Sequence, residues 1–127
     1  MHIHWLEKTK SDLIHHGASD LYYLVESLIK KEKMTYRQFV YDASYGISNG
    51  EDEGFNFALD SDYDDPNDFA SVEFYVGGME STEISVPTFI ELIQYLSDNY
   101  ILDNPTDKIS VEKSMLRIRQ RYNKFFK

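Results

Sequence analysis

The chain has 127 residues and a formal net charge of −9, with 22 Asp and Glu side chains against 13 Lys and Arg. This length suits a single domain, residues 1–127, and the absence of cysteine excludes disulfides, thiolate catalysis and cysteine-based zinc sites. The acidic balance argues against direct binding to nucleic acid or to an anionic membrane, because both would be repelled.

Two helices are predicted at the start of the chain. Residues 3–15 carry apolar side chains at a weak helical spacing, and Gly17 can close that helix. Ser19 or Asp20 can cap a second helix. Its apolar stripe follows the spacing i, i+3, i+4, i+7 through Leu21, Leu24, Val25 and Leu28.

A third helix is predicted after Thr35. Thr35 and Gln38 have the form of a capping box, and the apolar face that follows ends before Gly46. Residues 39–45 also alternate well enough to form a strand, which is the alternative. We favour the helix.

The middle of the chain changes to a period of two, which predicts an antiparallel sheet. The expected strands are residues 55–59, 70–76 and 79–86, and Gly77 with Gly78 forms a two-residue hairpin turn between the last two. One face of this sheet carries polar residues and is expected to face water.

Two helices are expected to complete the fold. Pro87 suits a first helical turn, and Thr88 with Glu91 forms a possible capping box. A last helix begins near Lys108. The fold class is therefore α+β, with a small antiparallel sheet of about three strands packed with four to five helices.

Charge is segregated along the chain. The net charge is +1 over residues 1–41 (six bases, five acids), −16 over residues 42–107 (sixteen acids, no base) and +6 over residues 108–127 (seven bases, one acid). Unneutralised carboxylates repel one another, so the middle block predicts a positively charged partner. The cations of the last helix can lie against the acidic remainder, and we assign no nucleic-acid binding to them.

Metal sites are not supported by the spacing of ligands. Residues 60–71 begin like a calcium loop, but Asp65 stands where glycine is needed and Ser71 where a bidentate glutamate is needed. The pairs His2 with His4 and His15 with His16 lack a third ligand. We expect no metal and no cofactor. No carboxylate pair is singled out for acid and base catalysis, so no catalytic residue is assigned.

The candidate binding surface consists of carboxylates with tyrosines among them. Carboxylates on a folded domain can take the place of phosphates in a basic cleft, and tyrosine adds rigid contact area at low entropic cost. A surface kept acidic for solubility alone is the alternative. The predicted partner-binding residues are Glu51, Asp52, Glu53, Asp60, Asp62, Tyr63, Asp64, Asp65, Asp68 and Tyr75.

The chain resembles the bacterial immunity proteins of contact-dependent growth inhibition and related polymorphic toxin systems. The resemblance lies in the small size, the acidity, the strand at residues 55–59, the hairpin leading into residues 85–96 and the closing helix at residues 116–122. It implies a protein that binds a cognate toxin, frequently a nuclease, and blocks its active site or substrate channel. No binding residue is carried over by it.

The first hypothesis is therefore a non-catalytic immunity protein that covers the substrate cleft of a basic toxin domain with its acidic surface. The alternatives are a nucleic-acid mimic that inhibits a host nuclease, and a small metal-dependent hydrolase that uses Asp60, Asp62 and Asp64. No leader or membrane span is recognised, so we expect a cytoplasmic protein, as a monomer or weak dimer.

Overall fold

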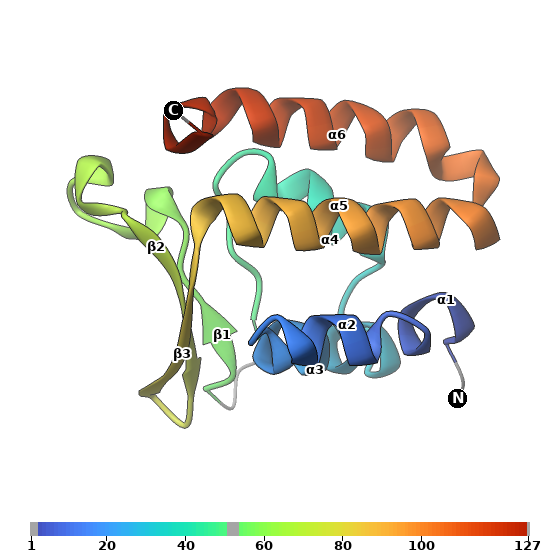
Figure 1. Ribbon diagram of the computed structural model, residues 1–127, viewed down its shortest axis with the longest axis horizontal. Coiled ribbons are helices and arrows are strands. Elements are labelled where there is room, and N and C mark those ends of the chain that lie inside the picture. The colour runs from blue at the N-terminus through green and yellow to red at the C-terminus, as the bar shows by residue number, and fades with distance from the viewer. Residues whose placement is uncertain (1–2, 51–53, 127) are drawn as a thin grey trace.

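The computed structural model describes residues 3–50 and 54–126. It confirms the α+β class: helices pack with a three-stranded antiparallel sheet (Figure 1). Among the described residues, no helix combines the length and the apolar character needed to cross a membrane.

The predicted first helix is divided into two. Helix α1 spans His4–Glu7 and helix α2 spans Lys10–His15. The break falls at Thr9, a buried residue whose hydroxyl donates to the carbonyl oxygen of Leu6 at 2.6 Å. A threonine that bonds back to the preceding turn competes with the helical pattern, which explains the break.

Helix α3 spans Ser19–Lys30 and buries the predicted apolar stripe. Its N-cap is Ala18, without a side-chain hydrogen bond, so neither Ser19 nor Asp20 caps it. Ala18 is buried, and the Asp20 carboxylate accepts a hydrogen bond from Thr82 at 2.7 Å instead. Asp20 therefore joins this helix to the sheet.

Helix α4 spans Tyr36–Ala43, which confirms the helix and excludes the strand considered for this segment. The Thr35 hydroxyl accepts from the amide of Gln38 at 3.1 Å, as the capping box requires. The Gln38 side chain donates to Asp42 at 2.7 Å, so the reciprocal half of the box is not formed.

The sheet contains β1 (Asn56–Phe57), β2 (Ser71–Val76) and β3 (Met79–Ser85) in that spatial order. The glycines between β2 and β3 have φ angles of 62° and 81°, a region that glycine enters without steric cost. This confirms the predicted two-residue hairpin.

The hairpin contains a β-bulge. Next to the turn, Val76 pairs with Met79 and Tyr75 with Glu80, but beyond it Phe74 pairs with Thr82. The extra residue in β3 is therefore Ser81. It brings Ile84 to the same side as Phe74, so both strands present their apolar side chains to the helices.

The remaining chain forms α5 (Val86–Asp103), η3 (Pro105–Asp107), α6 (Lys108–Arg121) and η4 (Asn123–Phe126). The start of α6 at Lys108 confirms the prediction. Helix α5 is capped by Ser85, whose hydroxyl accepts from the Thr88 amide at 3.2 Å, and not by Thr88. The earlier cap lets Pro87 lie in the first turn, where a missing amide hydrogen costs nothing.

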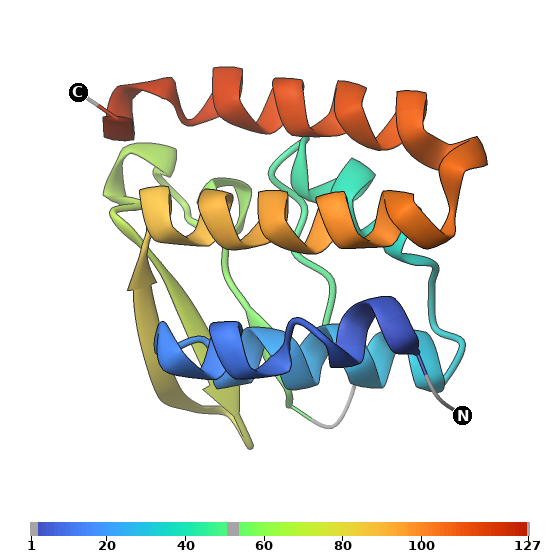
Figure 2. The same cartoon turned by 45° about the vertical axis from the view of Figure 1, so that its right-hand side comes forward.

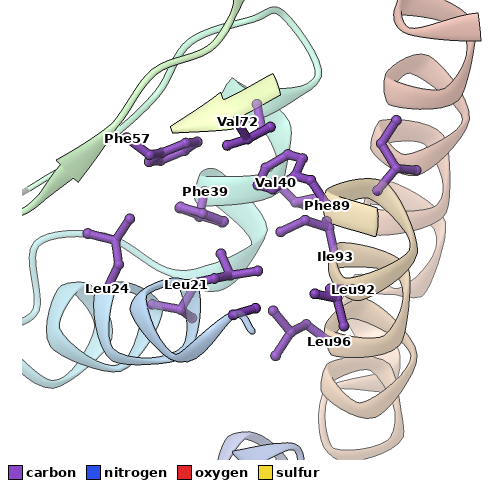
Figure 3. Packing of buried hydrophobic residues seen from close by; sticks show 14 of the residues in the cluster. Leu21, Leu24, Phe39, Val40, Phe57, Val72, Phe89, Leu92, Ile93 and Leu96 are labelled. Carbon is purple, nitrogen blue, oxygen red and sulfur yellow. The ribbon is translucent and has the colours of Figure 1, made fainter. Parts of the chain in front are cut away.

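Helix α5 lies between α6 on one side and the N-terminal helices on the other, and β2 and β3 stand at one end of this stack (Figures 1 and 2). The buried apolar side chains form one cluster that joins the sheet to the helices. Figure 3 shows the centre of this cluster, where side chains from α3, α4, β1, β2 and α5 converge: Leu21, Phe39, Val40, Phe57, Val72, Phe89 and Ile93.

Candidate functional site

The outer face of the sheet points away from the helices and carries polar side chains. Along β2, Val72 and Phe74 are buried against the helices, so the intervening Glu73 points outward. In β3 the exposed Glu83 alternates with the buried Ile84. We call the outward-facing set the acidic sheet face, which consists of Tyr63, Ser71, Glu73, Tyr75 and Glu83.

Two carboxylates face each other across this hairpin. Glu73 and Glu83 are direct cross-strand partners. Side chains in such positions lie within a few ångström at Cβ, and like charges there destabilise the sheet. The fold therefore holds two negative charges together at a cost to its own stability.

Hydroxyl groups surround this carboxylate pair. Glu73 accepts hydrogen bonds from Tyr63 at 3.2 Å and from Tyr75 at 2.6 Å, and Glu83 accepts one from Ser71 at 2.5 Å. The hydrogen bond to Glu73, together with partial burial, raises the pKa of Tyr75 to about 12. Partial burial and the charge of Glu73 raise the pKa of Tyr63. Both tyrosines therefore remain neutral hydrogen-bond donors at neutral pH.

No cation neutralises the pair from within the described part of the chain. Over residues 3–50 and 54–126, the acidic middle block forms ion pairs through Asp60, Glu91 and Asp107 only. The hydroxyl hydrogen bonds fix the orientation of Glu73 and Glu83 but leave their charge in place.

We expect Glu83→Gln to stabilise the free protein by about 0.2–1 kcal/mol, since the amide removes the cross-strand repulsion and still accepts from Ser71. Urea unfolding followed by circular dichroism measures this. Glu112→Gln is the matched control, because it makes the same change of net charge at an exposed position of α6. A Glu83 variant no more stable than the control would show that the two carboxylates do not repel each other.

The predicted acidic loop folds into two short turns, η1 (Asp60–Asp62) and η2 (Pro66–Asp68). Asp62 accepts from the Ser48 hydroxyl at 2.6 Å and from the Leu59 amide at 2.8 Å, and Asp65 caps η2 through the Asn67 amide at 3.0 Å. These carboxylates have structural hydrogen bonds and are also exposed.

Asp64 and Asp68 are exposed on the same loop. The loop is held in place by Phe69, which is buried and whose ring lies 5.6 Å from that of Tyr122 and 5.8 Å from that of Phe125. The exposed carboxylates Asp64 and Asp68 therefore lie on a loop that Phe69 fixes to the core.

Asp60, one of the predicted binding residues, already has a charged partner within the chain. The Arg121 guanidinium donates to its two carboxylate oxygens at 3.1 and 2.9 Å, and the Tyr122 hydroxyl donates at 2.7 Å. The carboxylate lies in a partly buried position between η1 and α6, with 18% of its side chain exposed. Its role is to join the acidic block to the basic helix.

Gly46 lies against this ion pair. Its φ angle is 77°, and a Cβ atom built there would lie 2.5 Å from Arg121 Nη2 and 2.7 Å from Asp60 Oδ1. A side chain at this position would be strained by the backbone and would require Arg121 or Asp60 to move.

Glu51, Asp52 and Glu53, also predicted to bind a partner, lie outside the described residues. The chain before them, at Gly50, lines a hollow of about 420 Å³ together with Ser48, Asn56 and two predicted residues, Asp62 and Tyr75. This hollow adjoins the acidic sheet face through Tyr75.

The carboxylates proposed for a metal-dependent hydrolase are directed to different partners. Asp60 is paired with Arg121, Asp62 accepts from Ser48 and Leu59, and Asp64 is exposed. Within residues 3–50 and 54–126, no three His, Asp or Glu side chains are grouped so as to hold a metal ion. His2 lies outside the described residues.

The basic helix α6 directs cations at the acidic remainder, as the sequence suggested. Besides the bond of Arg121 to Asp60, Arg119 pairs with Glu91 at 3.0 Å. Arg117 lies over the ring of Tyr45 at 4.6 Å and donates to the Ser44 hydroxyl at 3.0 Å. Tyr45 is 45% exposed, so this arginine and tyrosine form a second surface cluster, on the face shared by α4 and α6.

The sequence-based site omitted Glu73 and Glu83, which lie at the centre of the acidic sheet face. Their alternation with buried apolar residues placed them on the wet face of the predicted hairpin. Their pairing was not predictable from the turn, because the bulge at Ser81 changes the register.

Comparison with protein-family models, with curated proteins and with solved structures gives no match.

Proposed function

We propose that this chain is a non-catalytic immunity protein that binds a basic toxin domain through the acidic sheet face. The observation that carries the proposal is the cross-strand pair Glu73 and Glu83, which the described chain leaves without a counter-ion. A cation from a partner placed between these carboxylates replaces repulsion with attraction, so binding recovers the stability that the free protein lacks.

The residues around the pair suit an arginine or lysine of the partner. Tyr63 and Tyr75 hold Glu73 in a fixed orientation, so little side-chain freedom is lost on binding. Asp64, Asp65 and Asp68 extend the negative field beside the face and steer the approach of a cationic domain. A nuclease is the favoured toxin, because its substrate cleft is lined with cations that otherwise meet phosphates.

The choice of a toxin as the partner rests on the resemblance of the sequence to immunity proteins. The choice of the acidic sheet face as the binding surface rests on the positions of its side chains. The producing cell needs the inhibitor where the toxin would act, which places the complex in the cytoplasm. A nucleic-acid mimic directed at a host nuclease would use the same surface, and the choice of partner in the experiment separates the two.

The test is co-expression with a basic nuclease toxin domain, taken from the gene immediately upstream where that gene encodes one. We expect restored growth, a complex on size-exclusion chromatography, and an association rate near 10⁸ M⁻¹s⁻¹ at low salt, on the order of that of steered complexes, that falls steeply with added salt. Failure to protect against the adjacent toxin, with tight binding to an unrelated host nuclease, would replace the immunity role with the mimic. An association rate independent of salt would remove the acidic sheet face from the proposal.

A further inference from the structure

Helix α2 lies alongside the N-terminal half of α5 (Figures 1 and 2), and a hollow of about 470 Å³ opens between them. Helix α5 supplies its apolar walls, chiefly Pro87, Leu92 and the ring of Tyr95. Asp12 and His16 border it from the α2 side. None of these residues belongs to the acidic sheet face.

Asp12 places a fixed negative charge at the rim of this hollow. Its Oδ2 accepts the Tyr95 hydroxyl at 2.6 Å, and that hydrogen bond raises the pKa of Tyr95. The other carboxylate oxygen, Oδ1, takes no hydrogen bond within the described residues. The Tyr95 hydroxyl therefore holds the carboxylate in place while leaving one oxygen for a further donor.

His16 and Glu91 complete the polar border. His16 Nδ1 lies 2.7 Å from the carbonyl oxygen of Asp12, and because a carbonyl oxygen only accepts, this nitrogen carries the proton. Glu91 Oε1 is paired with Arg119 at 3.0 Å. Unlike Glu91, Asp12 forms no ion pair with any side chain of the described residues.

We propose that this hollow receives an arginine side chain of a partner protein. The apolar walls suit the aliphatic stem, the Tyr95 ring offers a face on which the guanidinium can stack, and Asp12 supplies a charge-assisted acceptor. An anion is excluded by the two carboxylates at the border, and a purely apolar side chain would leave Asp12 Oδ1 without a donor. The site does not depend on the acidic sheet face, and either one stands without the other.

The test uses Nα-acetyl-arginine amide as the probe and its neutral isostere, Nα-acetyl-citrulline amide, as the comparison. Both are titrated into the ¹⁵N-labelled protein. We expect the arginine derivative to shift the amide resonances of His16, Thr88 and Leu92 and to saturate in the millimolar range, roughly as a single side chain allows. Citrulline is expected to bind about tenfold more weakly, since it keeps the shape and loses the charge.

Asp12→Asn is the decisive variant, because the amide oxygen still accepts from Tyr95 while the charge is lost. This variant should bind the arginine probe about fivefold more weakly than the unmodified protein does, and its affinity for the citrulline probe should be unchanged. Glu112→Gln makes the same change of charge at an exposed position of α6, outside both proposed sites, and should leave both titrations unchanged. Thermal unfolding confirms that each variant is folded.

Equal affinity for arginine and citrulline in the unmodified protein would overturn the proposal, whatever the variants do. The absence of saturable shifts at His16, Thr88 and Leu92 would overturn it as well. Because the probe needs no toxin, failure here leaves the proposed function standing, and failure of the toxin to bind leaves the arginine site standing.

Discussion

Asp60→Ala is expected to lower the free energy of unfolding by about 2–3 kcal/mol, the largest loss that we predict for a single carboxylate in this protein. The change leaves the Arg121 guanidinium and the Tyr122 hydroxyl without their acceptor. Tyr122 is only 2% exposed, so water cannot readily replace the lost hydrogen bond. Urea unfolding of the two proteins measures the difference.

Asp64→Ala is the matched control, because it removes the same charge from the same loop at an exposed position. Its effect should stay within about 0.5 kcal/mol. Equal losses for the two variants would show that the contact between η1 and α6 contributes nothing beyond net charge.

The contribution of Asp60 should also depend on pH. Partial burial alone would raise the pKa of Asp60, but the hydrogen bonds from Arg121 and Tyr122, with the charge of Arg121, outweigh it and lower the pKa. A lowered pKa in the folded state means that the stabilisation is complete above the ordinary carboxyl value of about 3.9 and is lost as the pH falls below it. The difference in free energy of unfolding between the wild type and Asp60→Ala should therefore become smaller only at acidic pH.

Replacing both Glu73 and Glu83 by lysine is expected to slow association with the toxin domain by about 100-fold at low salt. The double change turns the centre of the acidic sheet face from attraction to repulsion for a cationic partner. Stopped-flow fluorescence gives the rate, and circular dichroism checks that the variant folds. The salt dependence of the rate should become flatter in parallel.

The control is Asp98→Lys with Glu112→Lys, which makes the same change of net charge at exposed positions on α5 and α6. We expect this pair to slow association only severalfold, through the long-range field. If both double variants slowed association equally, net charge rather than the acidic sheet face would govern the encounter.

Local patterns were sufficient to predict most elements. The capping residue Thr35, the Gly77 and Gly78 turn and the start of α6 near Lys108 all depend on residues within a few positions of each other, and the structure confirms them. Two incorrect predictions for helix ends also concern residues that are close in sequence. Ser85 caps α5 in place of Thr88, and Thr9 interrupts the first helix because its hydroxyl bonds to Leu6.

The hairpin shows where two correct local patterns disagree. A two-residue turn without a bulge pairs Glu73 with Thr82, whereas the apolar alternation of the two strands requires Phe74 opposite Thr82. The bulge at Ser81 reconciles them and places Glu73 opposite Glu83. The turn pattern alone leaves the carboxylate pair undetected, because it pairs Glu73 with Thr82.

Which carboxylate of the acidic loop forms an ion pair is decided by contacts between residues that are distant in sequence. Asp60 and Arg121 are separated by 61 positions, so no local pattern distinguishes this structural carboxylate from the exposed Asp64. Charge segregation predicted that the two blocks could neutralise each other in part, but not which acid would be taken. The structure therefore shows Asp60 in an internal ion pair and adds Glu73 and Glu83 as further candidates on the sheet.

Hydrogen–deuterium exchange on the complex with the toxin domain tests the central claim most directly. We predict slowed exchange in β2, β3 and the η1–η2 loop, with α6 unchanged. Protection confined to α4 and α6, around Arg117 and Tyr45, with the backbone amides of β2 and β3 still exchanging as in the free protein, would contradict it.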